Sequence, residues 1–132
     1  MNLYFQALLL FSIGAALYPL LELLYRRRTH WTMALAGGLC FLSICSVNHL
    51  LPDAPLWLKC LVCAAAVTVI EFMIGCVVNL KFHLGVWNYS HMPLNLLGQI
   101  CLPFSVVWFV LSLPAMRLGE LLEHLFSGQL LF

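Results

Sequence analysis

The sequence has little charge. Only 8% of its 132 residues are Asp, Glu, Lys or Arg, whereas 64% are hydrophobic and the mean hydropathy is +1.01. A soluble domain carries roughly 25% charged residues, so this chain cannot cover a surface that faces water. The composition excludes a soluble enzyme and a disordered segment. It also excludes a nucleic-acid partner, because the net charge is only +1 and a basic patch is missing. We therefore predict an integral membrane protein whose main partner is the lipid bilayer.

The sequence also lacks the motifs of several common chemistries. It contains no glycine-rich loop of the kind that cradles phosphate, so we do not expect the chain to hydrolyse nucleotide by itself. Its five histidines are scattered without the helical spacing of metal ligands. We therefore expect no metal site and no cofactor, and an enzyme is the less favoured interpretation.

Long apolar runs are what the sequence does contain. Each is close to the roughly 20 residues that span a hydrocarbon core. They cover about residues 3–25, 33–51, 56–80 and 92–113. The runs do not alternate in polarity, and an open sheet edge cannot lie in lipid, which disfavours strands. Pro93 and Pro114 stand near the start and end of the last run, where proline is tolerated or terminates a helix. The predicted fold class is an all-α membrane protein, a single domain over residues 1–132 with a four-transmembrane-helix bundle.

The residues after Pro114 show a different pattern. Leucines recur at the spacing of one helical face, and charged residues take the other side. The leucines are Leu118, Leu121, Leu122 and Leu125, and the polar residues are Arg117, Glu120, Glu123 and His124. We predict a short C-terminal amphipathic helix over about residues 115–126, lying in the membrane interface. The alternative is a frayed tail that packs on nothing.

Basic residues are unevenly divided between the two sides of the four-span arrangement. Arg26–Arg28 and Lys81 fall on one side, and Lys59 and Arg117 fall on the other. Basic residues near membrane spans stay in the cytoplasm, so a count of four against two places the loop after the first span inside. We therefore expect a multi-pass protein of the cell membrane (plasma or inner) with non-cytoplasmic termini.

Glu71 is the most informative polar residue. It lies well inside the third run, where an ionisable side chain costs roughly 2.5–3.5 kcal/mol and needs a partner, a proton or a water-filled cavity. Glu71, Gly75 and Asn79 are four residues apart and share one helical face. We expect this face to point inward. Two interpretations remain open: Glu71 handles a solute or proton, or a protonated Glu71 holds the bundle together.

Further polar residues are predicted at the same end of the bundle. Asn95 and Gln99 are four residues apart, and the short loop before them returns the fourth run beside the third. We therefore expect Asn79 to lie within reach of one of these amides. Glu22 lies near the end of the first run, where it can pair with Arg26 along the helix. The alternative for Glu22 is a helix-end charge in the interface.

The segment between the third and fourth runs is predicted to fold over this polar cluster. Gly85 can adopt left-handed backbone geometry, Ser90 can cap a following helix and Pro93 fits the first turn of that helix. Trp87 and Tyr89 would then cover the mouth of the bundle, with the Tyr89 hydroxyl presented to the cluster. The alternative is a plain aromatic anchor among lipid headgroups.

One cysteine pair offers a different function. Cys60 and Cys63 form a Cys-x-x-Cys at the outward end of the third run, and Cys45 can approach them from the second run. Such a pair is typical of thiol–disulfide chemistry, but reactive thiolates need a cation or polar surroundings, and only Lys59 is adjacent. Ordinary packing cysteines are the favoured interpretation.

One block of the sequence resembles a known family. It runs from Gly85-Val86-Trp87-Asn88-Tyr89-Ser90 through Pro93 and Gly98-Gln99-Ile100-Cys101 to Trp108. This block is similar to the signature of the CmpB-like membrane family, labelled "putative ABC-transporter type IV". Upstream segments support the resemblance: Glu22–Tyr25, Thr29–Met33, Gly37-Gly38, and Glu71-Phe72 with Gly75 and Asn79. Asn88 stands where an aspartate is expected. The resemblance covers nearly the whole chain and implies a permease-like function, without naming a substrate.

These observations predict a permease-like membrane protein with an intramembrane polar cluster that binds a cation, a proton or a small polar solute. The expected cluster consists of Glu71, Asn79, Asn95 and Gln99, with Glu22, Trp87 and Tyr89 at its mouth. A chain this small encloses little cavity alone, so we expect a homodimer or a separate partner subunit. The alternatives are a membrane thiol–disulfide oxidoreductase that uses Cys60 and Cys63, and a non-transporting structural or assembly subunit.

Overall fold

The computed structural model describes residues 3–27 and 29–127. Its elements, in chain order, are α1 (Leu3–Arg26), α2 (Trp31–Leu50), α3 (Leu56–Gly75), the π-helix η1 (Cys76–Lys81), β1 (Asn95–Leu96), β2 (Ile100–Cys101) and α4 (Leu102–Ser127). The described part of the chain contains four helices that are long and apolar enough to cross a membrane. The predicted all-α, four-helix membrane fold is confirmed.

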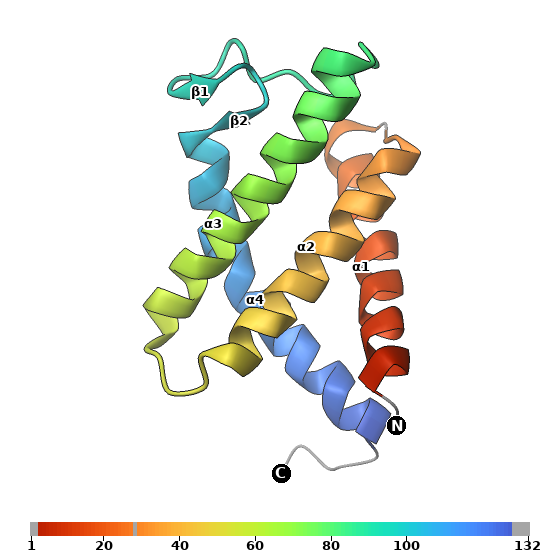
Figure 1. Ribbon diagram of the computed structural model, residues 1–132, viewed down its shortest axis with the longest axis vertical. Helices are drawn as coiled ribbons and strands as arrows, with labels where there is room; N and C mark the ends of the chain where they lie inside the picture. Colours follow the sequence, from red (N-terminus) through yellow and green to blue (C-terminus); the bar gives the residue numbers. More distant parts are fainter. Residues whose placement is uncertain (1–2, 28, 128–132) are drawn as a thin grey trace.

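The helices run back and forth between two ends of the bundle (Figure 1). The loops from α1 to α2 and from α2 to α3 are short, as is typical of antiparallel neighbours. At one end, which we name the hairpin end, residues 82–101 form a longer connection that contains the β1–β2 hairpin. The start of α1 and the end of α4 lie at the opposite end, which we name the terminal end (Figure 1).

Helices α1 and α2 approach each other closely because glycines face each other at their contact. A Cβ atom added at Gly37 would lie 2.5 Å from the Gly14 carbonyl oxygen and 2.5 Å from the Tyr18 Cβ. A Cβ added at Gly14 would in turn lie 2.6 Å from the Gly37 carbonyl oxygen. Small residues at a membrane helix interface allow this backbone contact, which is a main source of packing energy in lipid. The α1–α2 pair is therefore fixed by these glycines.

Helix α4 begins later than the sequence predicts. The predicted fourth span starts near residue 92, but residues 91–101 form turns and the short hairpin, and the helix begins at Leu102. Leu94, Leu97 and Gly98 have φ values of 53°, 54° and 71°, and this left-handed geometry interrupts a right-handed helix. Ser90 therefore caps no helix and Pro93 lies in a turn. Gly85, at φ 61°, does adopt the predicted left-handed conformation.

Helix α4 also ends later than predicted. It continues through Pro114 to Ser127 as one helix, so residues 115–126 are its last turns and not a separate interfacial helix. A proline removes only one helical N–H donor, and membrane helices tolerate this loss when neighbouring helices pack around it. Here Met116 is 2% exposed, and Leu118 and Leu122 pack against the cluster that contains Phe41 of α2. Packing on the bundle explains both the continuity of α4 and why its end is not a frayed tail.

Candidate functional site

Glu71 lies on the interior side of α3 and is only 7% exposed. Its two carboxyl oxygens accept hydrogen bonds from two different elements. The Tyr89 hydroxyl, from the connection after η1, donates to Oε1 at 2.9 Å, and the Trp108 indole N–H, from α4, donates to Oε2 at 2.9 Å. The prediction that Glu71 faces inward among polar neighbours is confirmed.

The described hydrogen-bond donors to Glu71 carry no positive charge. Among residues 3–27 and 29–127, its hydrogen-bond partners are Tyr89 and Trp108, both neutral. The carboxyl of Glu22 on α1, which is 9% exposed, lies close enough for its charge to act on Glu71. Two acidic side chains, from α1 and α3, thus lie near each other in the interior of the bundle.

Tyr89 is held in place by its ring as well as by its hydroxyl. The ring stacks on Phe104 of α4 with centroids 4.8 Å apart and planes 10° from parallel. Burial raises the pKa of the Tyr89 phenol above its usual range, and the nearby Glu71 charge adds to the effect. The hydroxyl therefore stays protonated and acts as a donor toward Glu71, as the sequence predicted.

The predicted contact between Asn79 and a later amide is also confirmed. The Asn79 Nδ2 group donates to Gln99 Oε1 at 2.8 Å, and Asn79 Oδ1 accepts from the Val86 backbone N–H at 2.7 Å. The Gln99 Nε2 group donates to the Leu97 carbonyl at 3.0 Å. Asn79 lies in the π-helical segment η1, a feature often found at functional sites. Two amides thus fasten the connection of residues 82–101 to the end of α3.

Trp87 covers this end of the bundle from inside the fold. It is 5% exposed, and its indole N–H donates to the Gln99 carbonyl at 2.9 Å. The ring belongs to a buried cluster with Met33 and Ala36 of α2. A Cβ added at Gly75 would lie 2.7 Å from Gln99 Oε1 and 2.9 Å from the Trp87 ring, so the glycine makes room for both side chains. Trp87 therefore covers the cluster, and the interpretation as a plain interfacial anchor is wrong.

Two predicted site residues lie differently from what the sequence suggested. Asn95 is exposed and shapes its own turn, donating to the Met92 carbonyl at 2.9 Å and accepting from the Gly98 N–H at 3.0 Å. The structure does not bring Asn95 to Glu71, because residues 92–101 are a hairpin and not a helix. Glu22 is buried near Glu71 rather than at a water-facing helix end. Its predicted pairing with Arg26 involves a side chain outside the described part of the chain.

Trp108 is a site residue that the sequence analysis missed. It stands in a long apolar run, and the sequence marks it only as the end of the block that resembles the family. The available signal was its indole N–H, which needs an acceptor when it is buried. Its ring also contacts Tyr18 of α1 edge-on, with centroids 5.7 Å apart. Trp108 therefore links α1, α3 and α4 around Glu71.

The cysteine pair is part of the hydrophobic core. Cys60 and Cys63 are 5% and 0% exposed, and they pack with Cys40, Val67 and Met116. All cysteines are free thiols. Buried in this way, a cysteine behaves as a small hydrophobic residue, which favours the packing interpretation.

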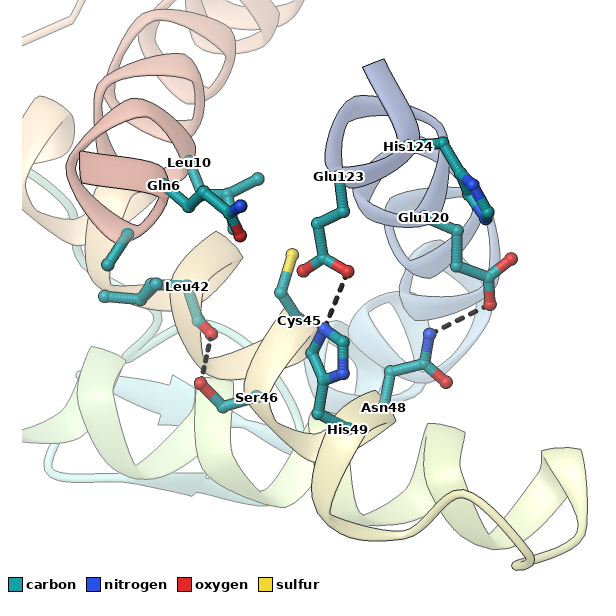
Figure 2. Close-up of a pocket in the computed structure, with 11 residues that line it drawn as sticks. Gln6, Leu10, Leu42, Cys45, Ser46, Asn48, His49, Glu120, Glu123 and His124 are labelled. Atoms are coloured by element: carbon teal, nitrogen blue, oxygen red, sulfur yellow. Dashed lines mark hydrogen bonds and ion pairs between the residues drawn. The ribbon is translucent and has the colours of Figure 1, made fainter. Parts of the chain in front are cut away.

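A pocket at the terminal end is a second feature that the sequence did not reveal (Figure 2). It has a volume of about 540 Å³ and is lined by residues of α1, α2 and α4. In its lining, the His49 Nε2 and Glu123 Oε2 atoms lie 2.6 Å apart, and Asn48 Nδ2 donates to Glu120 Oε1 at 2.9 Å. These residues belong to helices distant in sequence, and only the packing of α4 against α2 brings them together.

Comparison with known proteins identifies the family. The family described as "Putative ABC-transporter type IV" matches residues 9–127, which include every element that forms the Glu71 site. No curated protein and no solved structure matches the chain. The matched region contains most of α1 and all of α2, α3 and α4, so the chain is a multi-pass membrane protein of an ABC-transporter-related family. The chain belongs to the family described as "Putative ABC-transporter type IV", the same family that the sequence block resembles.

Proposed function

We propose that this protein is a permease-like transport component in which Glu71 binds a proton or a monovalent cation. One observation carries the proposal: an intramembrane carboxylate receives hydrogen bonds only from neutral groups, Tyr89 and Trp108, within the described residues. A structural ion pair would place a lysine or arginine against the carboxylate. A carboxylate without such a partner retains the ability to hold a mobile positive charge.

The connection of residues 82–101 fits a cover for such a site. Tyr89 contacts Glu71 directly, and Trp87 closes the hairpin end above it. The cover is held by the bond between Asn79 and Gln99, which can break without unfolding a helix. Displacement of this segment would expose Glu71 to the hairpin side of the membrane.

We further propose that the chain works with a second copy or a separate subunit. Four helices enclose little space. Glu71 lines neither the pocket at the terminal end nor a second pocket, which has Trp31, Leu35 and Val77 in its lining. The sequence also lacks a phosphate-binding loop, so any nucleotide-driven step would need a partner.

For orientation, we propose that the hairpin end faces the cytoplasm in a cell membrane (plasma or inner). Arg27 follows α1 and Lys81 ends η1, both at the hairpin end (Figure 1). Lys59 lies near the start of α3 and Arg117 in the second half of α4, toward the terminal end. An alkaline phosphatase fused after residue 132 is expected to be active, because that enzyme works only outside the cytoplasm. An inactive phosphatase fusion together with a fluorescent cytoplasmic reporter fusion at the same point would contradict this orientation.

Replacing Glu71 by glutamine is expected to abolish proton or cation movement while the fold is retained. The Tyr89 hydroxyl can accept as well as donate, so a glutamine amide can donate to Tyr89 and its oxygen can accept from Trp108. Purified protein in liposomes with an entrapped pH-sensitive or Na⁺-sensitive dye should dissipate an imposed gradient, and Glu71→Gln should do so only at the rate of protein-free liposomes. Infrared spectroscopy should detect a titrating carboxyl band that Glu71→Gln lacks.

Asp53→Asn is the matched control, because Asp53 lies exposed in the turn between α2 and α3. This variant makes the same acid-to-amide change far from the site and should behave as wild type. Folded Glu71→Gln protein with an unchanged flux and an unchanged carboxyl spectrum would show that Glu71 is a structural residue only.

A further inference from the structure

We propose that the pocket at the terminal end binds a small organic cation, with an ammonium group against Glu123 and an apolar group against α1 and α2. This site is separate from Glu71, whose hydrogen-bond partners do not line the pocket (Figure 2). The proposal does not depend on the proposed transport function.

The size and lining of the pocket suit such a ligand. Its volume of about 540 Å³ lies within the range of roughly 300–1,000 Å³ that is usual for small-molecule sites. Leu10 and Leu42 lie on one side of the pocket, and Glu123 and His49 lie on the other (Figure 2). Ala7 adds to the apolar lining. The apolar wall and the acidic edge are complementary to a molecule that is apolar at one end and cationic at the other.

The charges around the pocket single out Glu123. Glu120 already has Arg117, with Nη1 3.2 Å from Oε2, as well as the amide of Asn48. The described partner of Glu123 is His49, whose charge is conditional on protonation. The described ion-pair partner of Glu123 is thus an imidazole, whereas that of Glu120 is a guanidinium, so Glu123 is the carboxylate that matches an ammonium ligand.

The exposure of this pair shows how a ligand can enter. The His49 side chain is 68% exposed, whereas the Glu123 side chain is only 21% exposed. The imidazole therefore reaches inward from solvent to a carboxylate that is mostly shielded. An ammonium group entering from the pocket can take over the contact while His49 turns outward, with no movement of the helix backbones.

The test is direct binding of benzyltrimethylammonium to the full-length protein in phosphatidylcholine nanodiscs, measured by titration calorimetry. Phenylacetate, an anion with a similar ring, is the reference ligand and should not bind. Glu123→Gln is expected to raise the Kd roughly tenfold or more, since charged hydrogen bonds contribute about 1.5–3 kcal/mol. His49→Gln is expected to leave the Kd unchanged or lower it, because it removes the imidazole that competes with the ammonium group for Glu123.

Glu120→Gln is the comparison variant, one helical turn away in the same pocket. Because Arg117 already compensates Glu120, its effect on the Kd should be much smaller than that of Glu123→Gln. Equal weakening by both variants would overturn the assignment to Glu123, and so would equal binding of the cation and phenylacetate. Asp53→Asn should match the wild type. Glu71→Gln leaves this pocket intact, so the Kd of this variant for benzyltrimethylammonium should equal that of the wild type. This result would separate the present proposal from the proposed function.

Discussion

Replacing Gly37 by alanine is expected to lower the free energy of unfolding by about 2 kcal/mol more than the same change at the adjacent Gly38. At Gly37 the new methyl group would meet the Gly14 carbonyl oxygen and the Tyr18 Cβ, both at 2.5 Å. These atoms belong to the α1 backbone or lie next to it, so the two helices must separate. At Gly38 the three atoms nearest to the methyl group would all belong to the Phe11 ring, the first at 2.7 Å, and a ring edge can rotate away.

The two variants control for each other. Both residues are buried in α2, and both changes gain the same helix propensity. The difference therefore compares a methyl group that meets the α1 backbone with one that meets the Phe11 ring of α1. Unfolding in mixed detergent micelles, followed by helical circular dichroism, measures it. Equal stability of Gly37→Ala and Gly38→Ala would show that the α1 backbone at Gly14 moves away as easily as the Phe11 ring, which contradicts this prediction.

The helical spans could be predicted from the sequence because their cause is local. Lipid requires long apolar runs with internal backbone hydrogen bonding, and the first three spans have the expected bounds within a few residues. The fourth span was predicted to start too early, because residues 92–101 are apolar enough to be taken for part of a membrane helix. Their hairpin depends on left-handed backbone at Leu94 and Leu97, which composition does not reveal. The continuation of α4 past Pro114 depends on tertiary packing, which likewise has no local signal.

The centre of the candidate site could be predicted for a similar reason. Glu71, Asn79 and Gln99 are costly in lipid, so each had to find a partner inside the bundle. The sequence could not choose between Asn95 and Gln99, because that choice depends on the fold of the hairpin. It also could not show that Trp108 donates to Glu71, since an indole in an apolar run has many other possible neighbours. The terminal pocket depends on helix crossing alone and left no sequence pattern.

Removing the Gln99 side-chain acceptor is expected to release the connection of residues 82–101 while the four helices remain intact. Gln99 is 3% exposed, and its Oε1 is the acceptor for Asn79. Gln99→Met keeps the length and most of the volume but leaves the Asn79 donor without this partner. An unsatisfied buried polar group costs about 1–3 kcal/mol, so local opening of the segment should become roughly five- to 150-fold more frequent.

Hydrogen exchange followed by mass spectrometry measures this opening segment by segment. Amides of residues 82–101, including Val86 and Tyr89, should exchange faster in Gln99→Met, while those in α1 and α2 should not change. Gly75→Ala provides a steric comparison, because its methyl group would press on the Gln99 and Trp87 side chains. If Gly75→Ala speeds exchange in this segment and Gln99→Met does not, then packing holds the cover in place and the amide bridge does not. Faster exchange in both variants is the expected result, since the glycine and the amide support the same contact over Glu71.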